Sequence, residues 1–199
     1  SSSASASGPD SASGPDSASG PDSGSSPVAK LALADGTIYT GSAFGAVGEV
    51  YGEVVFNTSM TGYQEILTDP SYCGQIVTMT YPLIGNYGTS AADVESNRVQ
   101  VNGFVVREDC DDPSHPLSEG TVHDYLLENG VPGISGVDTR AVTRRLRSAG
   151  VMMGIITPRE DVSAALDVLS NSPRYGAFDV VGKVSTNEIY SWKGDAGEQ

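Results

Sequence analysis

The most constraining feature of this sequence is a polar run at residues 57–72 that joins two strand-like segments. The segments on either side, residues 49–56 and 75–81, are rich in β-branched and aromatic residues, which favour strands. Within the run, residues 62–67 are predicted to form a short helix. Pro70 fixes its own φ and disfavours helical backbone at the preceding residue, so a turn is predicted at residues 68–71.

So many polar groups between two apolar strands must find hydrogen-bond partners. They can bond to the local backbone, as Asx and Ser/Thr turns do, or they can bind a ligand or a partner protein, and the sequence leaves both roles open. The candidate side chains of this run, called here the motif run, are Asn57, Thr58, Ser59, Thr61, Gly62, Tyr63, Gln64, Glu65 and Asp69.

The part of the chain before the motif run is predicted to be rich in strands. Residues 28–33 and 37–39 are predicted to form a hairpin about the Asp35-Gly36 turn, and residues 42–47 a further short extended piece. A small barrel or a folded sheet is the expected arrangement.

Strands and helices alternate in the remainder of the chain. Strands are predicted at residues 104–107 and 151–157, with a short strand or extended link at 131–137. Helices are predicted from Ser118 to Asn129, from Asp138 to Gly150 and over residues 161–171, from capping residues and apolar spacing. The expected apolar positions of the first two helices are Val122, Leu126 and Leu127, with Tyr125 alongside, and Val142, Leu146 and Ala149. The fold class is therefore mixed α/β.

Four of the chain's eleven basic residues lie in the second of these helices. Three of them, Arg140, Arg144 and Arg147, share one helix face at i, i+4 and i+7. This face is either solvated and paired with nearby acids, or it meets an anionic patch on a partner protein. Arg144 and Arg147 are the candidate partner contacts, whereas Arg140, next to the helix cap, is expected to be structural.

The formal net charge of −14, from 25 acidic and 11 basic residues, argues against binding to nucleic acid or to an anionic membrane. The two cysteines, Cys73 and Cys110, have no metal-ligand spacing, so no metal site is predicted. Neither a secretory signal nor a membrane-spanning run is recognised, and a cytoplasmic location is expected.

Residues 1–26 contain three copies of Ser-Ala-Ser-Gly-Pro-Asp and lack large apolar side chains. Such a segment is expected to be a flexible extension, to which no function is assigned. Residues 27–192 are expected to form one domain, and residues 193–199 its end or the start of a linker.

No complete active site is predicted. The GxSxG, Walker and HExxH motifs are absent, and Cys73 is not in the strand-to-helix context that presents a nucleophile. His115, between two prolines, and His123 are expected to have no catalytic role. An enzyme that uses Cys73 or an unrecognised carboxylate pair is a remote alternative.

Several long strings resemble the N-terminal domain of the small, glutamine-hydrolysing subunit of carbamoyl phosphate synthetase. They are NTSMTGYQEILTDPSY at residues 57–72, QIVTMTYPLIGNYG at 75–88, the approach at 51–57 and GVDTR at 136–140. The resemblance extends over residues 28–192 and departs from the family pattern in the acidic, proline-containing loop at 108–118. It implies a swivelling β/β/α domain.

The resemblance also implies a function. The whole enzyme makes carbamoyl phosphate from glutamine, bicarbonate and ATP, for pyrimidine and arginine synthesis. In this family the Cys-His-Glu triad lies in a second, C-terminal glutaminase domain. The first domain holds the glutaminase domain and docks onto the large subunit, which uses ATP and Mg²⁺, so no cofactor is expected in this chain. Ser71 matches the serine by which this domain contacts glutamine. The alternative is a stand-alone interaction or regulatory module.

Overall fold

The computed structural model describes residues 26–173, 177, 179–186 and 188–189. Except for Ser26, the predicted extension lies outside the described residues, as do residues 190–192 of the predicted domain and its end at residues 193–199.

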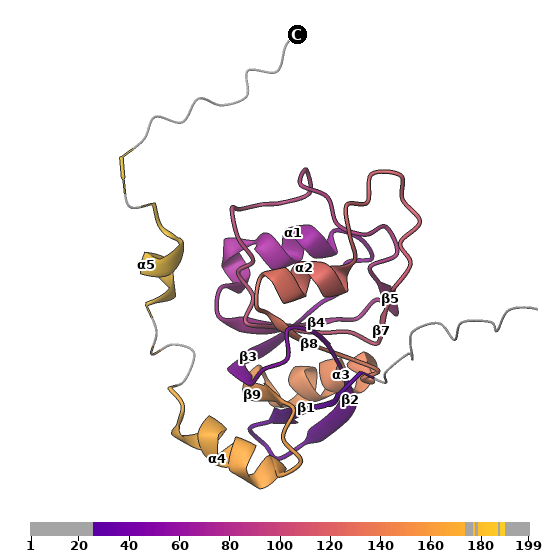
Figure 1. The fold of residues 1–199 in the computed structure, drawn as a ribbon. Coiled ribbons are helices and arrows are strands. Elements are labelled where there is room, and N and C mark those ends of the chain that lie inside the picture. The colour runs from indigo at the N-terminus through magenta and orange to yellow at the C-terminus, as the bar shows by residue number, and fades with distance from the viewer. Residues whose placement is uncertain (1–25, 174–176, 178, 187, 190–199) are drawn as a thin grey trace, which may run out of the picture.

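Seven strands close into a barrel at the centre of the molecule (Figure 1). In spatial order they are β1 (Val28–Leu33), β2 (Ile38–Gly45), β8 (Pro132–Ser135), β6 (Gly103–Val105), β4 (Gln75–Met79), β3 (Val50–Asn57) and β9 (Met152–Thr157), and β9 returns to pair with β1. Neighbours from β3 through β4 and β6 to β8 are parallel, and the other pairs are antiparallel. The barrel therefore has one end where four parallel strands begin and one where they finish.

Helices α1 (Tyr63–Thr68) and α2 (Val122–Glu128) lie together on one side of the barrel, and α3 (Thr139–Ala149) and α4 (Val162–Asn171) lie toward the other (Figure 1). The remaining elements are the 3₁₀ turn η1 (Pro70–Tyr72), the short helix α5 (Val180–Val184) and a two-stranded parallel sheet of β5 (Leu83–Ile84) and β7 (Glu108–Asp109). No helix in this described part of the chain is long and apolar enough to span a bilayer.

The alternation of side chains along each strand divides the core into layers. In β4, Ile76 packs inside the barrel with α3, whereas Val77 and Met79 point outward to α1 and α2. In β9, Ile156 joins the interior layer and Ile155 packs against α4. Both β4 and β9 are thus covered on their two faces.

The structure confirms the mixed α/β class, the first hairpin and the second and third helices. Asp35 accepts a hydrogen bond from the Thr37 N–H at 2.9 Å in the predicted turn. Asp138 caps α3 by accepting from the Ala141 N–H, and Asp161 caps α4 by accepting from the Ser163 N–H. The predicted barrel or folded sheet is a closed barrel.

The predicted start of the helix at Ser118 was wrong. Thr121 is the cap of α2: its hydroxyl accepts from the Asp124 N–H at 3.0 Å and donates to the Asp124 carboxylate at 2.8 Å, a reciprocal pair that Ser118 has no residue to form. Ser118 donates instead to the Gly120 carbonyl.

Three other details differ from the sequence prediction. Leu127 and Ala149 are exposed, because the short helices bury only the residues that face the barrel. The piece predicted at residues 42–47 is part of β2, which runs unbroken to Gly45 because its far end pairs with β8.

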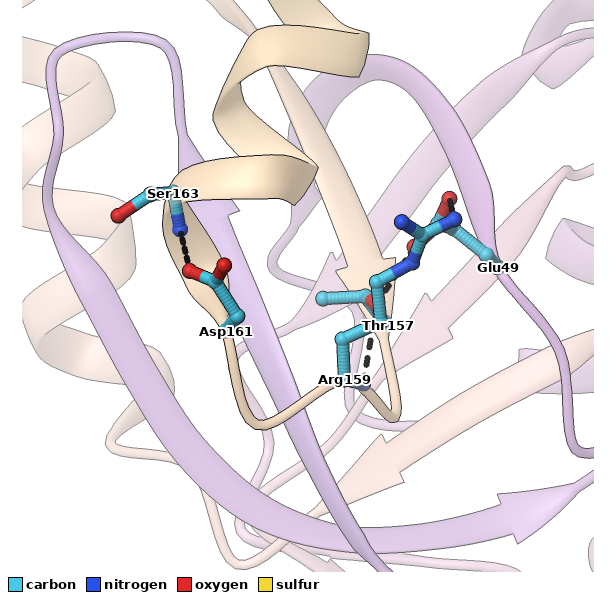
Figure 2. A network of polar contacts seen from close by, with 5 residues as sticks. All are labelled: Glu49, Thr157, Arg159, Asp161 and Ser163. Atoms are coloured by element: carbon cyan, nitrogen blue, oxygen red, sulfur yellow. Dashed lines mark hydrogen bonds and ion pairs between the residues drawn. The ribbon is translucent and has the colours of Figure 1, made fainter.

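A polar network fastens the loop before β3 to the turn between β9 and α4 (Figure 2). The Glu49 carboxylate accepts from the Thr157 hydroxyl at 2.6 Å and pairs with the Arg159 guanidinium at 2.7 Å. Asp161 caps the helix that follows. Because the Arg159 side chain is half exposed, the pair mainly orients this turn and adds little stability.

Candidate functional site

The motif run is the crossover between the adjacent parallel strands β3 and β4, and Asn57 connects its two ends. The Asn57 side-chain amide donates to the Tyr72 hydroxyl at 2.9 Å, and its oxygen accepts from the Ser59 N–H at 2.7 Å. The Asn57 carbonyl also accepts from the Thr80 N–H at 3.0 Å. One asparagine therefore fixes the exit from β3, the return at η1 and the exit from β4.

The start of α1 depends on a tyrosine from outside the run. Gly62 has φ of +80°, a left-handed conformation that favours glycine, and its N–H donates to the Tyr87 hydroxyl at 2.7 Å. The Tyr63 N–H donates to the same oxygen at 3.3 Å. The helix has no side-chain cap of its own, so Tyr87 supplies the missing acceptor.

Tyr63 is the buried anchor of the run. It is 1% exposed, its ring stacks on Tyr87 with centroids 4.2 Å apart, and its hydroxyl donates to the Gly88 carbonyl at 2.5 Å. Burial, followed by the neighbouring Tyr87, raises the pKa of Tyr63 far above its ordinary value, and burial raises the pKa of Tyr87 as well.

These raised pKa values predict loss of stability in alkali. An unfolded tyrosine ionises near pH 10, whereas folded Tyr63 keeps its proton, so the unfolded state binds fewer protons above that pH. Stability is then constant below about pH 10 and falls above it, by up to about 1.4 kcal/mol per pH unit for each such tyrosine. Urea unfolding as a function of pH measures this slope. Tyr63→Phe is expected to make it shallower, and an identical slope in that variant would contradict the assignment.

Two further polar side chains of α1 hold the segment that follows Tyr87. Gln64, 1% exposed, donates to the Ser90 carbonyl at 2.9 Å and accepts from the Ser90 N–H at 2.8 Å. The hydroxyl of buried Thr68 accepts from the Glu95 N–H at 2.9 Å, and its carbonyl accepts from the Ser96 hydroxyl at 2.6 Å. The inward side of the run therefore has a structural role.

Glu65 differs from these neighbours. Its carboxylate folds back over Gly62, where an added Cβ would lie 3.6 Å from Glu65 Oε2. That oxygen is buried and has no hydrogen-bond partner among the described residues. A single carboxylate does not make a metal site, and the described residues contain no cluster of three or more side chains able to hold a metal ion.

The outward residues of the motif run fall into two separate places. Thr58, Ser59 and Thr61 are exposed beyond the end of β3, together with Met60, whose exposed fraction is 70%. Ser71 is also exposed, but it lies in η1, next to the start of β4, where its N–H donates to the Asp69 carboxylate at 2.8 Å. Sequence analysis did not predict that the run has two exposed places, one beyond the end of β3 and one before the start of β4.

A groove of about 650 Å³ opens at the barrel end where the parallel strands begin. Its wall includes Cys73 and Gly74, just after Ser71, together with apolar side chains such as Val47 and Met153. Gln100 also lines it; this side chain is 8% exposed, and its Oε1 is buried without a hydrogen-bond partner in the described structure.

The reactive side chains outside the run have local roles. Cys73 is buried and leads from a 3₁₀ turn into a strand, the opposite order to a nucleophile elbow. His123 accepts from the Gly45 N–H through Nδ1 at 3.1 Å, and His115 accepts from the Leu117 N–H at 3.2 Å. His115 thus holds a local turn, and His123 holds the end of β2.

Residues 31–156, which span the barrel, the motif run and the groove wall up to Met153, match the profile of the family described as carbamoyl-phosphate synthase small chain, CPSase domain. The chain belongs to this family. The relationship predicted from the strings at residues 57–72, 75–88 and 136–140 is confirmed.

Curated small chains of bacterial carbamoyl phosphate synthase are about half identical to this chain. The one from Syntrophotalea carbinolica is 55% identical over 165 residues, which is 82% of this chain and 44% of the relative. Those from Rhodopirellula baltica (51% over 82% of this chain and 42% of the relative) and Clostridium perfringens (52% over 84% and 47%) are similar. The chain therefore spans under half the length of these small-chain relatives.

Among solved structures, an aminopeptidase from Aneurinibacillus sp. strain AM-1 superposes with a TM-score of 0.36 at 18% identity, over 66% of this chain and 31% of that one. This likeness is too distant to carry an argument.

Several residues that shape the small-chain site were not predicted. Tyr87, Ser90 and Gln100 lie 24 or more residues along the chain from the α1 atoms and strand ends that they serve, and nothing in their local sequence marks that role. Two signals were available: the buried polar groups of the run had to find partners somewhere, and the string at residues 75–88, which includes Tyr87, shares the resemblance with the run.

Proposed function

We propose that this chain is a non-catalytic N-terminal domain or fragment of the small subunit of glutamine-dependent carbamoyl phosphate synthetase. It docks onto the large subunit and supports the glutaminase domain. One observation carries this proposal. The chain is about 50% identical to small chains over nearly the whole described barrel, and this match spans less than half of the length of those small chains.

The geometry of the motif run supports a scaffold role. Tyr63, Gln64 and Thr68 use their polar groups to fix the segment from Tyr87 to Ser96, so these inward residues have none left for substrate. What they produce is a rigid crossover that presents exposed hydroxyls at fixed positions. Rigid supporting elements of this kind keep a binding residue in place.

Ser71 is the residue of this domain that we assign to glutamine. It is exposed, its backbone is fixed by the Asp69 carboxylate, and it stands two residues before the wall of the groove. A hydroxyl there can donate to or accept from the amide or carboxylate of the substrate. In this proposal the glutaminase domain, which carries the Cys-His-Glu triad, approaches the end of the barrel that holds Ser71.

The remaining parts of the reaction belong to other components. The large subunit binds ATP and Mg²⁺ and makes carbamoyl phosphate for pyrimidine and arginine synthesis, in the cytoplasm. This chain positions the glutaminase domain and contributes one contact to the substrate. Its strongly negative charge suits neither nucleic acid nor an anionic membrane as a partner.

The direct test measures glutamine hydrolysis in two mixtures. The chain alone is expected to release no glutamate above background. Mixed with the large subunit and the C-terminal part of a small chain, it is expected to restore glutamine-dependent synthesis of carbamoyl phosphate. Ser71→Ala is then expected to raise the KM for glutamine about 3- to 10-fold, the effect of one lost hydrogen bond.

A matched variant and two contrary results complete this test. Ser59→Ala removes an exposed hydroxyl at the other end of the crossover and is expected to leave the KM unchanged. Hydrolysis by the chain alone that exceeds its Ser71→Ala variant would refute the non-catalytic assignment. Binding to the large subunit without any restored synthesis would favour a stand-alone interaction module instead.

A further inference from the structure

The exposed face of α3 carries a row of three arginines that form no ion pair within the described residues. Arg140, Arg144 and Arg147, called here the basic row, are all exposed, while Val142 and Leu146 on the opposite face are buried in the barrel core. Within the described part of the chain, no carboxylate lies within 4.0 Å of any of the three guanidinium groups.

Two other arginines of the molecule do pair with acids, one of them on the same helix. Arg145, on the same helix, binds Asp35 of the first hairpin, and Arg159 binds Glu49. The chain has 25 acidic residues against 11 basic ones, so random placement would readily bring an acid next to the basic row. The three arginines instead form a positive strip on a negative molecule.

The basic row also opposes the stability of its own helix. Like charges at i, i+4 and at i, i+3 repel each other, which applies to Arg140 with Arg144 and to Arg144 with Arg147. Arg140 lies in the first turn, where the positive end of the helix dipole disfavours a cation. Packing of the opposite face stabilises the helix. The three positive charges of the row repel one another, and a bound anion would reduce this repulsion.

We propose that the basic row is a docking surface for a carboxylate-rich patch on a partner protein. The inference rests on the proposed function, in which that partner is the large synthetase subunit. Guanidinium groups in a row on one helix suit carboxylates well, because each can donate two parallel hydrogen bonds. A nucleic acid is negative along its whole length and would also meet the acidic surface beyond the row, whereas a local carboxylate patch on a protein needs to meet only the row.

The surface beside the N-terminal end of α3 is hollowed. A recess of about 400 Å³, lined by Arg107, Glu108 and Asp138 among others, lies just before Arg140. A partner side chain could enter this recess while its carboxylates meet the basic row. The basic row and the recess together provide charge complementarity and shape complementarity to a partner.

The test is calorimetric titration of the whole chain against the large subunit from the same organism. Arg144→Gln combined with Arg147→Gln keeps good helix formers in α3 and removes two charges. Lys30→Gln combined with Arg159→Gln removes two charges at the turn between β9 and α4 and serves as the matched control. The first variant is expected to bind at least about tenfold more weakly, and the control to bind as the unaltered chain does.

Two further measurements separate docking from a structural role. Raising the salt concentration is expected to weaken binding by the unaltered chain more than binding by the Arg144/Arg147 variant, because screening acts on the pairs that the variant lacks. The thermal midpoint of that variant is expected to be unchanged or slightly higher, since the row repels itself. A lowered midpoint that accounts for the binding loss would overturn the proposal.

The remaining outcomes are distinct. If the unaltered chain binds and both double variants bind equally well, the basic row is not the docking surface and the proposed function stands. If the unaltered chain does not bind the large subunit at all, its docking role fails, and the inference fails with it.

Discussion

Replacing Tyr63 with alanine is expected to destabilise the domain by about 3–5 kcal/mol, the usual cost of removing a buried aromatic ring. The ring is 1% exposed and stacks on Tyr87, so its loss leaves a cavity beneath α1. The Gly88 carbonyl would also lose the donor that now lies 2.5 Å away. Since Tyr87 accepts from the first N–H groups of α1, the crossover would loosen as a unit.

Urea unfolding followed by circular dichroism measures this loss, and two variants set its scale. Tyr63→Phe keeps the stacked ring and removes only the hydroxyl, so about 1–2 kcal/mol is expected. Tyr81→Ala removes a tyrosine that is 37% exposed and serves as the surface control, with an expected cost well below that of Tyr63→Ala. Equal losses for Tyr63→Ala and Tyr81→Ala would contradict the role of Tyr63 as the anchor of the motif run.

Gly41→Ala is expected to be about as damaging, at roughly 3 kcal/mol or more, although it adds a single methyl group. A Cβ at Gly41 would lie 2.1 Å from the Ser135 carbonyl oxygen and 3.0 Å from an Ile134 side-chain carbon. The first of these atoms is backbone of β8 and cannot rotate away. Strands β2 and β8 must therefore separate, at the pairing that joins the first hairpin to the parallel part of the barrel.

The matched control is Gly48→Ala. A Cβ at Gly48 would meet only Pro132 Cγ at 3.5 Å, an ordinary contact, so a change within about 1 kcal/mol is expected, in either direction. Differential scanning calorimetry of the two variants compares them under one condition. A thermal midpoint for Gly41→Ala that equals that for Gly48→Ala would mean that the strands do not approach as closely as described.

The elements that could be predicted are those with local signals. Asp138 and Asp161 cap their helices through backbone N–H groups two or three residues away, and Asp35-Gly36 closes its hairpin within the turn itself. In each case the residues that decide the structure are neighbours in the sequence, so their order is enough.

The closure of the barrel depends on contacts between distant segments. Strand β2 pairs with β8, and β1 pairs with β9, across more than 80 residues of intervening chain. Strand composition does not say which strands become neighbours. The Ser118 prediction failed for a different, local reason: the Ser118 hydroxyl donates to the Gly120 carbonyl, and Thr121 has the better-placed partner in Asp124.

The candidate site could be located in part. The motif run was identified as the candidate site from its composition and from its resemblance to the small chains. The run divides into an inward set, which includes Tyr63 and Gln64, and an outward set, which includes Thr58 and Ser71. This division depends on the orientation of α1 against the barrel. The partners that bury the inward set come from residues 87–96, and that pairing has no trace in the run itself.

The pairing of β1 with β9 places the first and the last strand of the barrel side by side, and Lys30 and Thr157 are directly opposite each other in the ladder. The chain thus enters and leaves the barrel at nearly the same point. A domain with adjacent ends can be inserted into a loop of another protein or circularly permuted without stretching its strands. The barrel can therefore be connected to other domains through two chain segments that lie close together on its surface.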